Sequence, residues 1–173
     1  MAKAAQGEIA VIIAAMNAEA TIGRAVASAL AEPEVAEVVV VDDASRDATA
    51  AAARAADDGT GRLRILRKDF NGGPAASRNL AIRVSTAPLI ALLDSDDYLV
   101  KGRMARLLAM GGDDWDLLAD DILIIPEALA AVSPEPPEAG SADAIVFDLE
   151  TFVLGNITSR TGHRAELGFL KPL

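Results

Sequence analysis

The chain has 173 residues and a formal net charge of −10, and 51% of its residues are hydrophobic. This length and apolar content are sufficient for one soluble domain with a buried core. The negative charge argues against nucleic acid as a partner, because phosphate binding needs clustered Lys and Arg. Since cysteine is absent, disulfides and thiolate metal sites are excluded, and a metal would need oxygen ligands or the single histidine, His163.

Predicted strands alternate with predicted helices along the first hundred residues. In chain order, β-branched runs predict strands at 8–14, 37–42, 62–67 and 88–94, and Ala-rich segments predict helices at 19–31, 47–56, 74–84 and 101–110. One strand–helix unit every 25 to 28 residues, roughly, is typical of a mostly parallel sheet. Uninterrupted apolar strands suit burial on two sides, so the predicted fold class is α/β with helices on both faces of the sheet.

The apolar run after Glu8 is too short to span a bilayer and lacks the cleavage pattern of a signal peptide. No stretch of about 18 uncharged apolar residues occurs elsewhere, so we expect no membrane-spanning segment. Peripheral attachment to a membrane surface stays open.

The regular pattern ends near residue 112. Residues 116–129 predict another strand and a short helix, 133–141 form a Pro- and Glu-rich loop or linker, and 144–156 are strand-like again. The closing residues "GFLKPL" show no packing partner in the sequence. We therefore expect the second part of the chain to be an incomplete unit.

In parallel α/β sheets, ligands bind at the carboxyl ends of the strands, where each strand leads into the next helix. Four predicted loops should converge there. They are "AAMNAEAT", "DDASRDAT", "KDFNGGPAASRN" and "DSDDYLV".

The second loop begins with two acids, Asp42 and Asp43, at a strand end, and Ser45 or Asp47 is placed to cap the next helix. In the simpler interpretation both acids serve only the strand end and the cap. In the functional one, a carboxylate accepts the imide N–H of a nucleobase.

The third loop joins two glycines, which allow close backbone approach, to Pro74 in the first helical turn and Arg78 one turn later. Free N–H groups at a helix start attract anions, and an arginine adds a forked donor for phosphate or a base carbonyl. The alternative is a Gly-Gly turn followed by a surface arginine. A P-loop is excluded, because its Gly-Lys-Ser/Thr ending is absent.

The fourth loop places Asp94, Asp96 and Asp97 within four positions, although like charges that close repel by roughly 1 kcal/mol per pair even in water. The pair Asp94 and Asp96 suits Mg²⁺ or Mn²⁺, which take one or two carboxylates and complete their shell with water and substrate phosphates. The alternative is a solvated acidic turn that caps the next helix.

Weaker signals lie elsewhere in the chain. His163 stands in a polar segment typical of a surface turn, and Trp115 is interpreted as a packing residue. Asp120 and Asp121 flank an apolar stretch as solvated charges.

Taken together, "VIIAAMNAEATI", "VVVVDDASRDAT", "NGGPAASRNLAI" and "LIALLDSDDYLV" resemble, in order and spacing, the family-two inverting glycosyltransferases of the GT-A fold. The stretch from "FDLETFVLGN" to "RAELGFLKPL" is similar to the branch that builds bacterial exopolysaccharide of the succinoglycan type. The resemblance implies one incomplete GT-A (Rossmann-like) domain over 1–173. Its nucleotide-sugar-binding half would span about 8–112, and its partial acceptor-side half about 113–173.

The resemblance also implies metal-assisted, inverting transfer from a UDP-sugar donor to a glycan or lipid-linked saccharide acceptor. Asp43 would bind the uracil imide, Arg78 the base or diphosphate, and Asp94 the ribose or the metal. The implied substrate-binding residues are Met16, Asn17, Glu19, Asp43, Asn71, Arg78, Asp94 and Ser95. Asp94 and Asp96 would hold Mn²⁺ or Mg²⁺. A cytoplasmic location is implied, with attachment to the inner face of the membrane and homo-oligomerisation left open.

Two departures from the family pattern stand out. Ala14 and Met16 replace the usual Pro and aromatic residue of the first loop. The family's catalytic base, an Asp usually preceded by Glu, lies beyond Leu173, so no catalytic residue is assigned. Glu166, Asp120 and Asp121 are the acids that would have to substitute for it.

Two other functions fit parts of the pattern. A shortened glycosyltransferase would bind nucleotide without transferring sugar. A receiver domain that accepts phosphate on aspartate would also carry an acidic pair and a later Asp, but it needs the Asp-Asp strand first and a later Lys. Here a full strand–helix unit precedes Asp42, and "ILIIPE" brings no Lys.

Overall fold

The computed structural model describes residues 7–111, 115, 117–120 and 169–170. In chain order its elements are β1 (Ile9–Ala15), α1 (Ile22–Leu30), β2 (Val35–Asp42), α2 (Thr49–Ala55), β3 (Leu63–Arg67), α3 (Gly73–Val84), β4 (Leu89–Asp94), α4 (Arg103–Gly111), β5 (Leu117–Leu118) and β6 (Phe169–Leu170). The four strands and four helices predicted before residue 112 are all confirmed, with ends shifted by a few residues.

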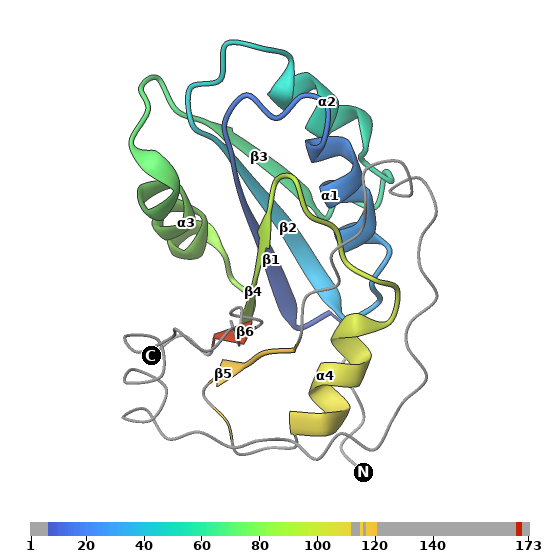
Figure 1. Ribbon diagram of the computed structural model, residues 1–173. Coiled ribbons are helices and arrows are strands. Elements are labelled where there is room, and N and C mark those ends of the chain that lie inside the picture. The colour runs from blue at the N-terminus through green and yellow to red at the C-terminus, as the bar shows by residue number, and fades with distance from the viewer. Residues whose placement is uncertain (1–6, 112–114, 116, 121–168, 171–173) are drawn as a thin grey trace, which may run out of the picture.

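The strands form one sheet in the order β3-β2-β1-β4-β6-β5. β1 pairs in parallel with β2 and with β4, and β2 pairs in parallel with β3. Their four carboxyl ends therefore lie at one edge of the sheet (Figure 1). The strand order reverses between β1 and β4, and this switch point is where open α/β sheets bind ligands.

Alternate residues of the central strand pack on opposite faces of the sheet. Ile9, Val11 and Ile13 belong to a core cluster shared with α1, α2 and α4. Ala10 and Ile12 belong to a second cluster shared with α3, which covers the other face (Figure 1). The prediction of a mostly parallel sheet flanked by helices on both faces is confirmed, and burial on both faces explains why the central strand β1 is apolar throughout.

Three predictions for the second part of the chain have an outcome. The strand expected within 116–129 is present as β5, whereas the short helix expected after it lies outside the described residues. Trp115 packs against the first core cluster, as expected. The expectation that "GFLKPL" has no packing partner is wrong, because Phe169–Leu170 pairs antiparallel with Ile90–Ala91 of β4 and with Leu117–Leu118 of β5. Pairing between segments so distant in sequence leaves no periodic signal, which is why the sequence did not show it. The predicted loop at 133–141 and strand at 144–156 lie outside the described residues.

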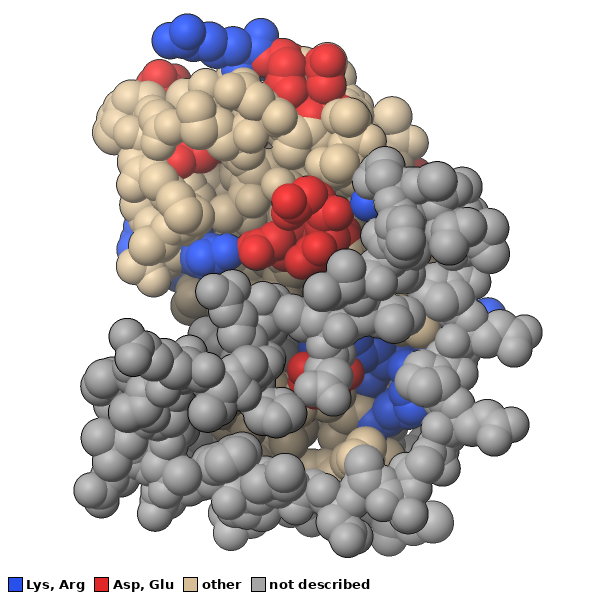
Figure 2. Space-filling model, viewed as in Figure 1, with Lys and Arg blue, Asp and Glu red and all other residues tan. Residues whose placement is uncertain are grey.

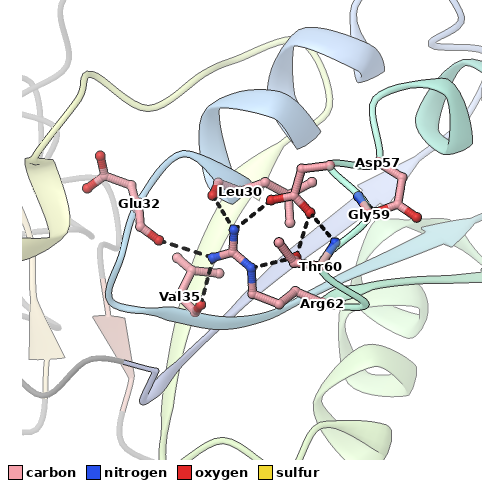
Figure 3. A network of polar contacts seen from close by, with 8 residues as sticks. Leu30, Glu32, Val35, Asp57, Gly59, Thr60 and Arg62 are labelled. Atoms are coloured by element: carbon pink, nitrogen blue, oxygen red, sulfur yellow. Dashed lines mark hydrogen bonds and ion pairs between the residues drawn. The ribbon is translucent and has the colours of Figure 1, made fainter.

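Arg62 ties the end of α1 to the strands that follow it. Its guanidinium donates to the carbonyl oxygens of Leu30 at 2.6 Å and Val35 at 3.1 Å, and it pairs with Asp58 at 2.7 Å (Figure 3). Hydrogen bonds from Thr60 and Arg62 lower the pKa of Asp58 to about 2. The guanidinium of Arg62 therefore makes its bonds within the fold, at the opposite end of β3 from the predicted site.

Within the described residues, no helix is both long and apolar enough to cross a membrane.

Candidate functional site

Four loops follow the carboxyl ends of the parallel strands and lie at the same edge of the sheet (Figure 1). They span residues 16–21, 43–48, 68–72 and 95–102. The predicted convergence of the four motifs is thus present in the structure.

The first and second loops are joined by reciprocal hydrogen bonds around Asn17. The backbone N–H of Asn17 donates to Ser45 Oγ at 2.9 Å, and the N–H of Arg46 donates to Asn17 Oδ1 at 2.9 Å. Asn17 has φ 51°, a left-handed conformation that Asn tolerates better than most residues. Asn17 therefore shapes the edge of the site through its backbone and its amide together.

Glu19 continues this link toward α2. Its carboxylate accepts the N–H of Ala48 at 2.8 Å, and its own N–H donates to Asp47 Oδ2 at 3.1 Å. Asp47 in turn accepts the N–H of Thr49, the first residue of α2. The N-cap position is Ala48 and no side chain caps this helix, so the predicted capping by Ser45 or Asp47 is wrong. The contact of Asn17 and Glu19 with a nucleotide stays a prediction, while their contacts within the protein explain why these residue types are present.

Asp43 lies at the base of the site, with its side chain 4% exposed. Oδ1 is 2.6 Å from Lys68 Nζ and accepts the N–H of Gly72 at 2.9 Å, and Oδ2 accepts the N–H of Gly73 at 2.7 Å. Burial alone would raise the pKa of Asp43, but these bonds and the charge of Lys68 outweigh it and hold the pKa below 3.8, the ordinary value. Asp43 is therefore a charged, buried acceptor that anchors the third loop.

This arrangement corrects one expectation. The N–H groups of Gly72 and Gly73, predicted to be free for an anion at the start of α3, already donate to Asp43. Lys68, which was not predicted from the sequence as a site residue, is the countercharge that keeps Asp43 ionised. The available signal was a lysine directly after the third strand, at the same sheet edge as the acidic pair.

Asp42 serves the end of the strand, which is the simpler of the two roles considered for the acidic pair. It is buried, accepts the N–H of Ser45 at 2.9 Å and lies 3.6 Å from Arg67 Nε. Its contacts close the turn that follows β2. Between these residues Ala44 has φ 59°, an uncommon conformation for a residue with a Cβ, and such strained positions concentrate at functional sites.

The structure brings Arg78 of α3 to Asp94 at the end of β4. Nη2 of Arg78 donates to Asp94 Oδ1 at 2.5 Å, and both side chains are partly exposed. Acidic atoms form a patch in the middle of this face, over the end of β4, and basic atoms lie beside it (Figure 2). The third and fourth loops thus meet through a pair of opposite charges.

The fourth loop begins with a tight turn, in which the N–H of Asp97 donates to the carbonyl oxygen of Asp94 at 3.1 Å. Asp96 and Asp97 are exposed and Ser95 is half-buried. Part of this loop is held by Glu32, which is fully buried and accepts the N–H groups of Gly102 and Met104 at the start of α4.

The acidic residues of this loop fit a cation that keeps part of its own shell. The described residues contain no group of three or more potential ligands, so a cation held entirely by side chains is not indicated there. Arg78 binds Oδ1 of Asp94, while Oδ2 and the carboxylate of Asp96 make no hydrogen bond to another described residue. Two carboxylates of this kind suit Mg²⁺ or Mn²⁺ with water and substrate phosphates as further ligands.

The rim of the site includes apolar atoms. Met16 is 48% exposed, and its sulfur lies 2.8 Å from Asn71 Nδ2, so the first and third loops touch here. Phe70, which precedes Asn71, is 74% exposed. Phe70 was not among the residues predicted from the sequence, although an aromatic residue between Asp69 and Asn71 in a polar loop was a usable signal.

Asp120, one of the acids considered as a substitute base, is held by α4. Arg103 Nε lies 3.0 Å from both carboxylate oxygens of Asp120, and Nη2 of Arg103 also pairs with it. An acid engaged in this way is poorly placed to accept a proton. Asp121, His163 and Glu166 lie outside the described residues.

The fold and this site define a class of protein: an α/β protein with a Rossmann-like sheet and charged side chains at the topological switch point, where such sheets bind ligands. Residues 10–124 match the family model of Glycosyl transferase family 2. The chain belongs to this family. Membership excludes the receiver-like alternative.

Two succinoglycan biosynthesis proteins are among the curated relatives that are similar to the chain. It is 52% identical over 173 residues to the succinoglycan biosynthesis protein ExoU of Rhizobium meliloti (strain 1021), covering 100% of this chain and 50% of ExoU. It is 35% identical over 167 residues to ExoO of the same organism, covering 96% of this chain and 47% of ExoO. The chain thus spans about half the length of these relatives.

Among solved structures, S. aureus TarS 1-349 in complex with UDP-GlcNAc is similar to the chain. It has a TM-score of 0.54 and 30% sequence identity, over 60% of this chain and 30% of the TarS chain. This likeness confirms the GT-A fold that the sequence implied.

Proposed function

We propose that this chain is the donor-binding part of a glycosyltransferase that moves a sugar from UDP to a glycan or lipid-linked saccharide during exopolysaccharide biosynthesis. The observation that carries the proposal is the meeting, at one sheet edge, of the buried Asp43 with the Arg78–Asp94 pair. Similarity to ExoU supports the polysaccharide product, and the TarS complex supports a UDP-sugar donor. Reaction at the cytoplasmic face of the membrane is part of the same proposal.

Asp43 is the proposed reader of uracil. A carboxylate has about four acceptor positions, and Lys68, Gly72 and Gly73 occupy three of them. The remaining position on Oδ2 can accept the N3–H of uracil. Cytosine presents an acceptor nitrogen at that place, so an ionised Asp43 would favour UDP over CDP.

Arg78 is the proposed ligand of the diphosphate. It is partly exposed and already lies at the acidic loop, so a small rotation would redirect its second nitrogen to a phosphate oxygen. Asp94 and Asp96 would hold Mn²⁺ or Mg²⁺, which when bound supplies positive charge that stabilises the departing nucleoside diphosphate.

The proposed transfer inverts the anomeric carbon. An acceptor hydroxyl oxygen forms a bond to that carbon as the bond to the diphosphate oxygen breaks, and the hydroxyl proton passes to a carboxylate base. No described residue is assigned as that base. The described residues would therefore supply donor binding and leaving-group stabilisation.

Calorimetric titration with nucleotide tests this proposal. UDP should bind in Mn²⁺ and poorly in a chelator, because a diphosphate beside Asp94, Asp96 and Asp97 otherwise adds repulsion. Asp96→Ala should abolish the Mn²⁺ enhancement. Equal affinity for UDP in both solutions would remove the metal from the proposal.

Base selectivity is the second arm of the test. Asp43→Asn keeps the shape of the side chain but can present its N–H₂ group, so the preference for UDP over CDP should narrow. Unchanged selectivity would place base recognition at another residue.

A further inference from the structure

Three polar side chains, two in α1 and one just after it, bind the fourth loop, which carries the acidic residues. They occupy positions 24, 28 and 32, and residues spaced by four lie on one side of a helix. Each of them reaches a different part of the segment 96–104. The spacing matches the path of the loop along α1.

Arg24 makes the contact nearest the predicted metal ligands. Its Nη2 donates to the carbonyl oxygen of Asp96 at 3.2 Å, and its guanidinium carbon lies 4.7 Å from the centre of the Tyr98 ring. A guanidinium over an aromatic face is attracted by the ring as well as by the carbonyl. Arg24 therefore holds the backbone of Asp96 from one side and packs against Tyr98 on the same loop.

Ser28 and Glu32 hold the rest of the loop. Ser28 Oγ accepts the N–H of Leu99 at 3.0 Å. Glu32 accepts the N–H groups of Gly102 at 2.6 Å and Met104 at 2.9 Å. Both residues bind groups beyond the acidic turn, so they fix the end of the loop, whereas Arg24 fixes the turn itself.

The contact between Arg24 and Tyr98 is not optimal for stability. Arg24 Nε and the Tyr98 hydroxyl are buried, and neither has a hydrogen-bond partner among the described residues. Unpaired buried polar atoms are destabilising, and in native proteins they call for a specific explanation. Positioning of the acidic turn would explain why an arginine and a tyrosine are kept here.

We propose that Arg24 is a positioning residue for Asp96: by holding the Asp96 carbonyl toward α1, it directs the Asp96 carboxylate outward, where a divalent cation and the donor diphosphate would bind. This inference rests on the proposed function. It adds a residue of α1, outside the four site loops, that acts only through the backbone of the acidic turn.

The test compares Arg24→Met with Arg83→Met in the 173-residue chain. Both changes remove one guanidinium and keep an unbranched stem, but Arg83 is exposed in the last turn of α3, at the opposite edge of the sheet (Figure 1). Calorimetry measures UDP affinity with Mn²⁺ and with a chelator. Circular dichroism checks that each variant is folded.

Loss of an outer-shell partner typically lowers metal affinity by about 10- to 100-fold, so Arg24→Met should lose most of the Mn²⁺ enhancement of UDP binding. Its UDP affinity in chelator should equal that of the unmodified chain. Arg83→Met should retain the full enhancement. A folded Arg24→Met variant that retains the full enhancement overturns the inference.

The test also covers a variant that does not fold and an unmodified chain without Mn²⁺ enhancement. If Arg24→Met does not fold, Arg24→Lys replaces it. Lys keeps the charge but lacks the planar fork that reaches ring and carbonyl together, so a partial loss is expected and no loss overturns the inference. Absence of any Mn²⁺ enhancement in the unmodified chain would instead refute the proposed function.

Discussion

Lys68 and Asp43 form a nearly buried ion pair that decides the charge at the base of the site. Their side chains are 15% and 4% exposed, and the atoms Nζ and Oδ1 are 2.6 Å apart. Such a pair adds little net stability, but removing one partner leaves an uncompensated charge, which is strongly destabilising. Replacement of Lys68 should therefore lower both the stability of the fold and the affinity for nucleotide.

We predict that Lys68→Met lowers the free energy of unfolding by about 2–3 kcal/mol, because Asp43 keeps only its two backbone donors. The pKa of Asp43 should rise toward its ordinary value, since burial would no longer be offset by the lysine. Urea unfolding measures the loss. The double variant with Asp43→Asn should lose less than the sum of the single variants, and strict additivity would contradict a direct coupling.

Arg78 is a cation that already occupies part of the predicted metal site. It binds Oδ1 of Asp94, and the two side chains are 32% and 51% exposed. Arg78 pairs with Asp94 and would compete with a divalent cation for it. With donor bound, the same guanidinium would serve the diphosphate.

Arg78→Gln should therefore raise the affinity for Mn²⁺ and lower the affinity for UDP. Exposed ion pairs contribute about 0.2–1 kcal/mol, so Mn²⁺ alone should bind about 1.4- to 5-fold more tightly. UDP in saturating Mn²⁺ should bind about 10-fold or more weakly, because a charge-assisted hydrogen bond to phosphate is lost. Electron paramagnetic resonance of free Mn²⁺ and calorimetry of UDP give the two values. Weaker binding of both ligands would show that Arg78 and the cation do not compete.

At the scale of elements, the first two loops behave as one unit. Asn17 and Glu19 bind the second loop through four hydrogen bonds to Ser45, Arg46, Asp47 and Ala48. Two positive φ angles, at Asn17 and Ala44, bend the chain tightly enough for these bonds to form. The site edge between β1 and β2 is thus fixed before any ligand binds.

We predict that Asn17→Gly lowers the free energy of unfolding by about 0.5–1 kcal/mol, because the bond to the Arg46 N–H is lost. Asn17→Ala should lose about 1–2 kcal/mol more, since it also places a Cβ in the left-handed conformation that glycine adopts freely. Urea unfolding of the two variants isolates the backbone contribution. Equal losses would mean that the loop relaxes away from positive φ.

The helices and strands were predictable from the sequence where a local sequence pattern determines them. Periodic apolar runs gave β1 to β4, and Pro74 in the first turn marked the start of α3. Contacts between distant segments were not predictable in the same way. Lys68 differs from other surface lysines only because the parallel pairing of β2 and β3 brings it to Asp43, and β6 exists only because β4 and β5 offer it an edge.

On the scale of the whole molecule, most of the acids considered for the site make contacts within the protein. Asp42 closes a turn and Asp43 is bound by Lys68 at the end of β2, whereas Asp120, which follows β5, pairs with Arg103. Asp94 and Asp96 are the proposed cation ligands. None of these five acids is left to activate an acceptor hydroxyl.

We therefore predict that this 173-residue chain binds UDP-sugar but transfers sugar very slowly. A positioned carboxylate base contributes about 10²- to 10⁴-fold to such a step, so a form extended through the next Glu-Asp pair should be faster by that factor. Radiolabelled UDP-sugars and membrane-derived acceptor measure transfer, and UDP affinity serves as the control that both forms bind donor. Equal transfer by both forms would mean that a base within residues 1–173 is sufficient, and Glu166→Gln, Asp121→Asn and Asp120→Asn would then identify it. Because Arg103 holds both oxygens of Asp120, we expect Asp120→Asn to leave transfer unchanged even in that case.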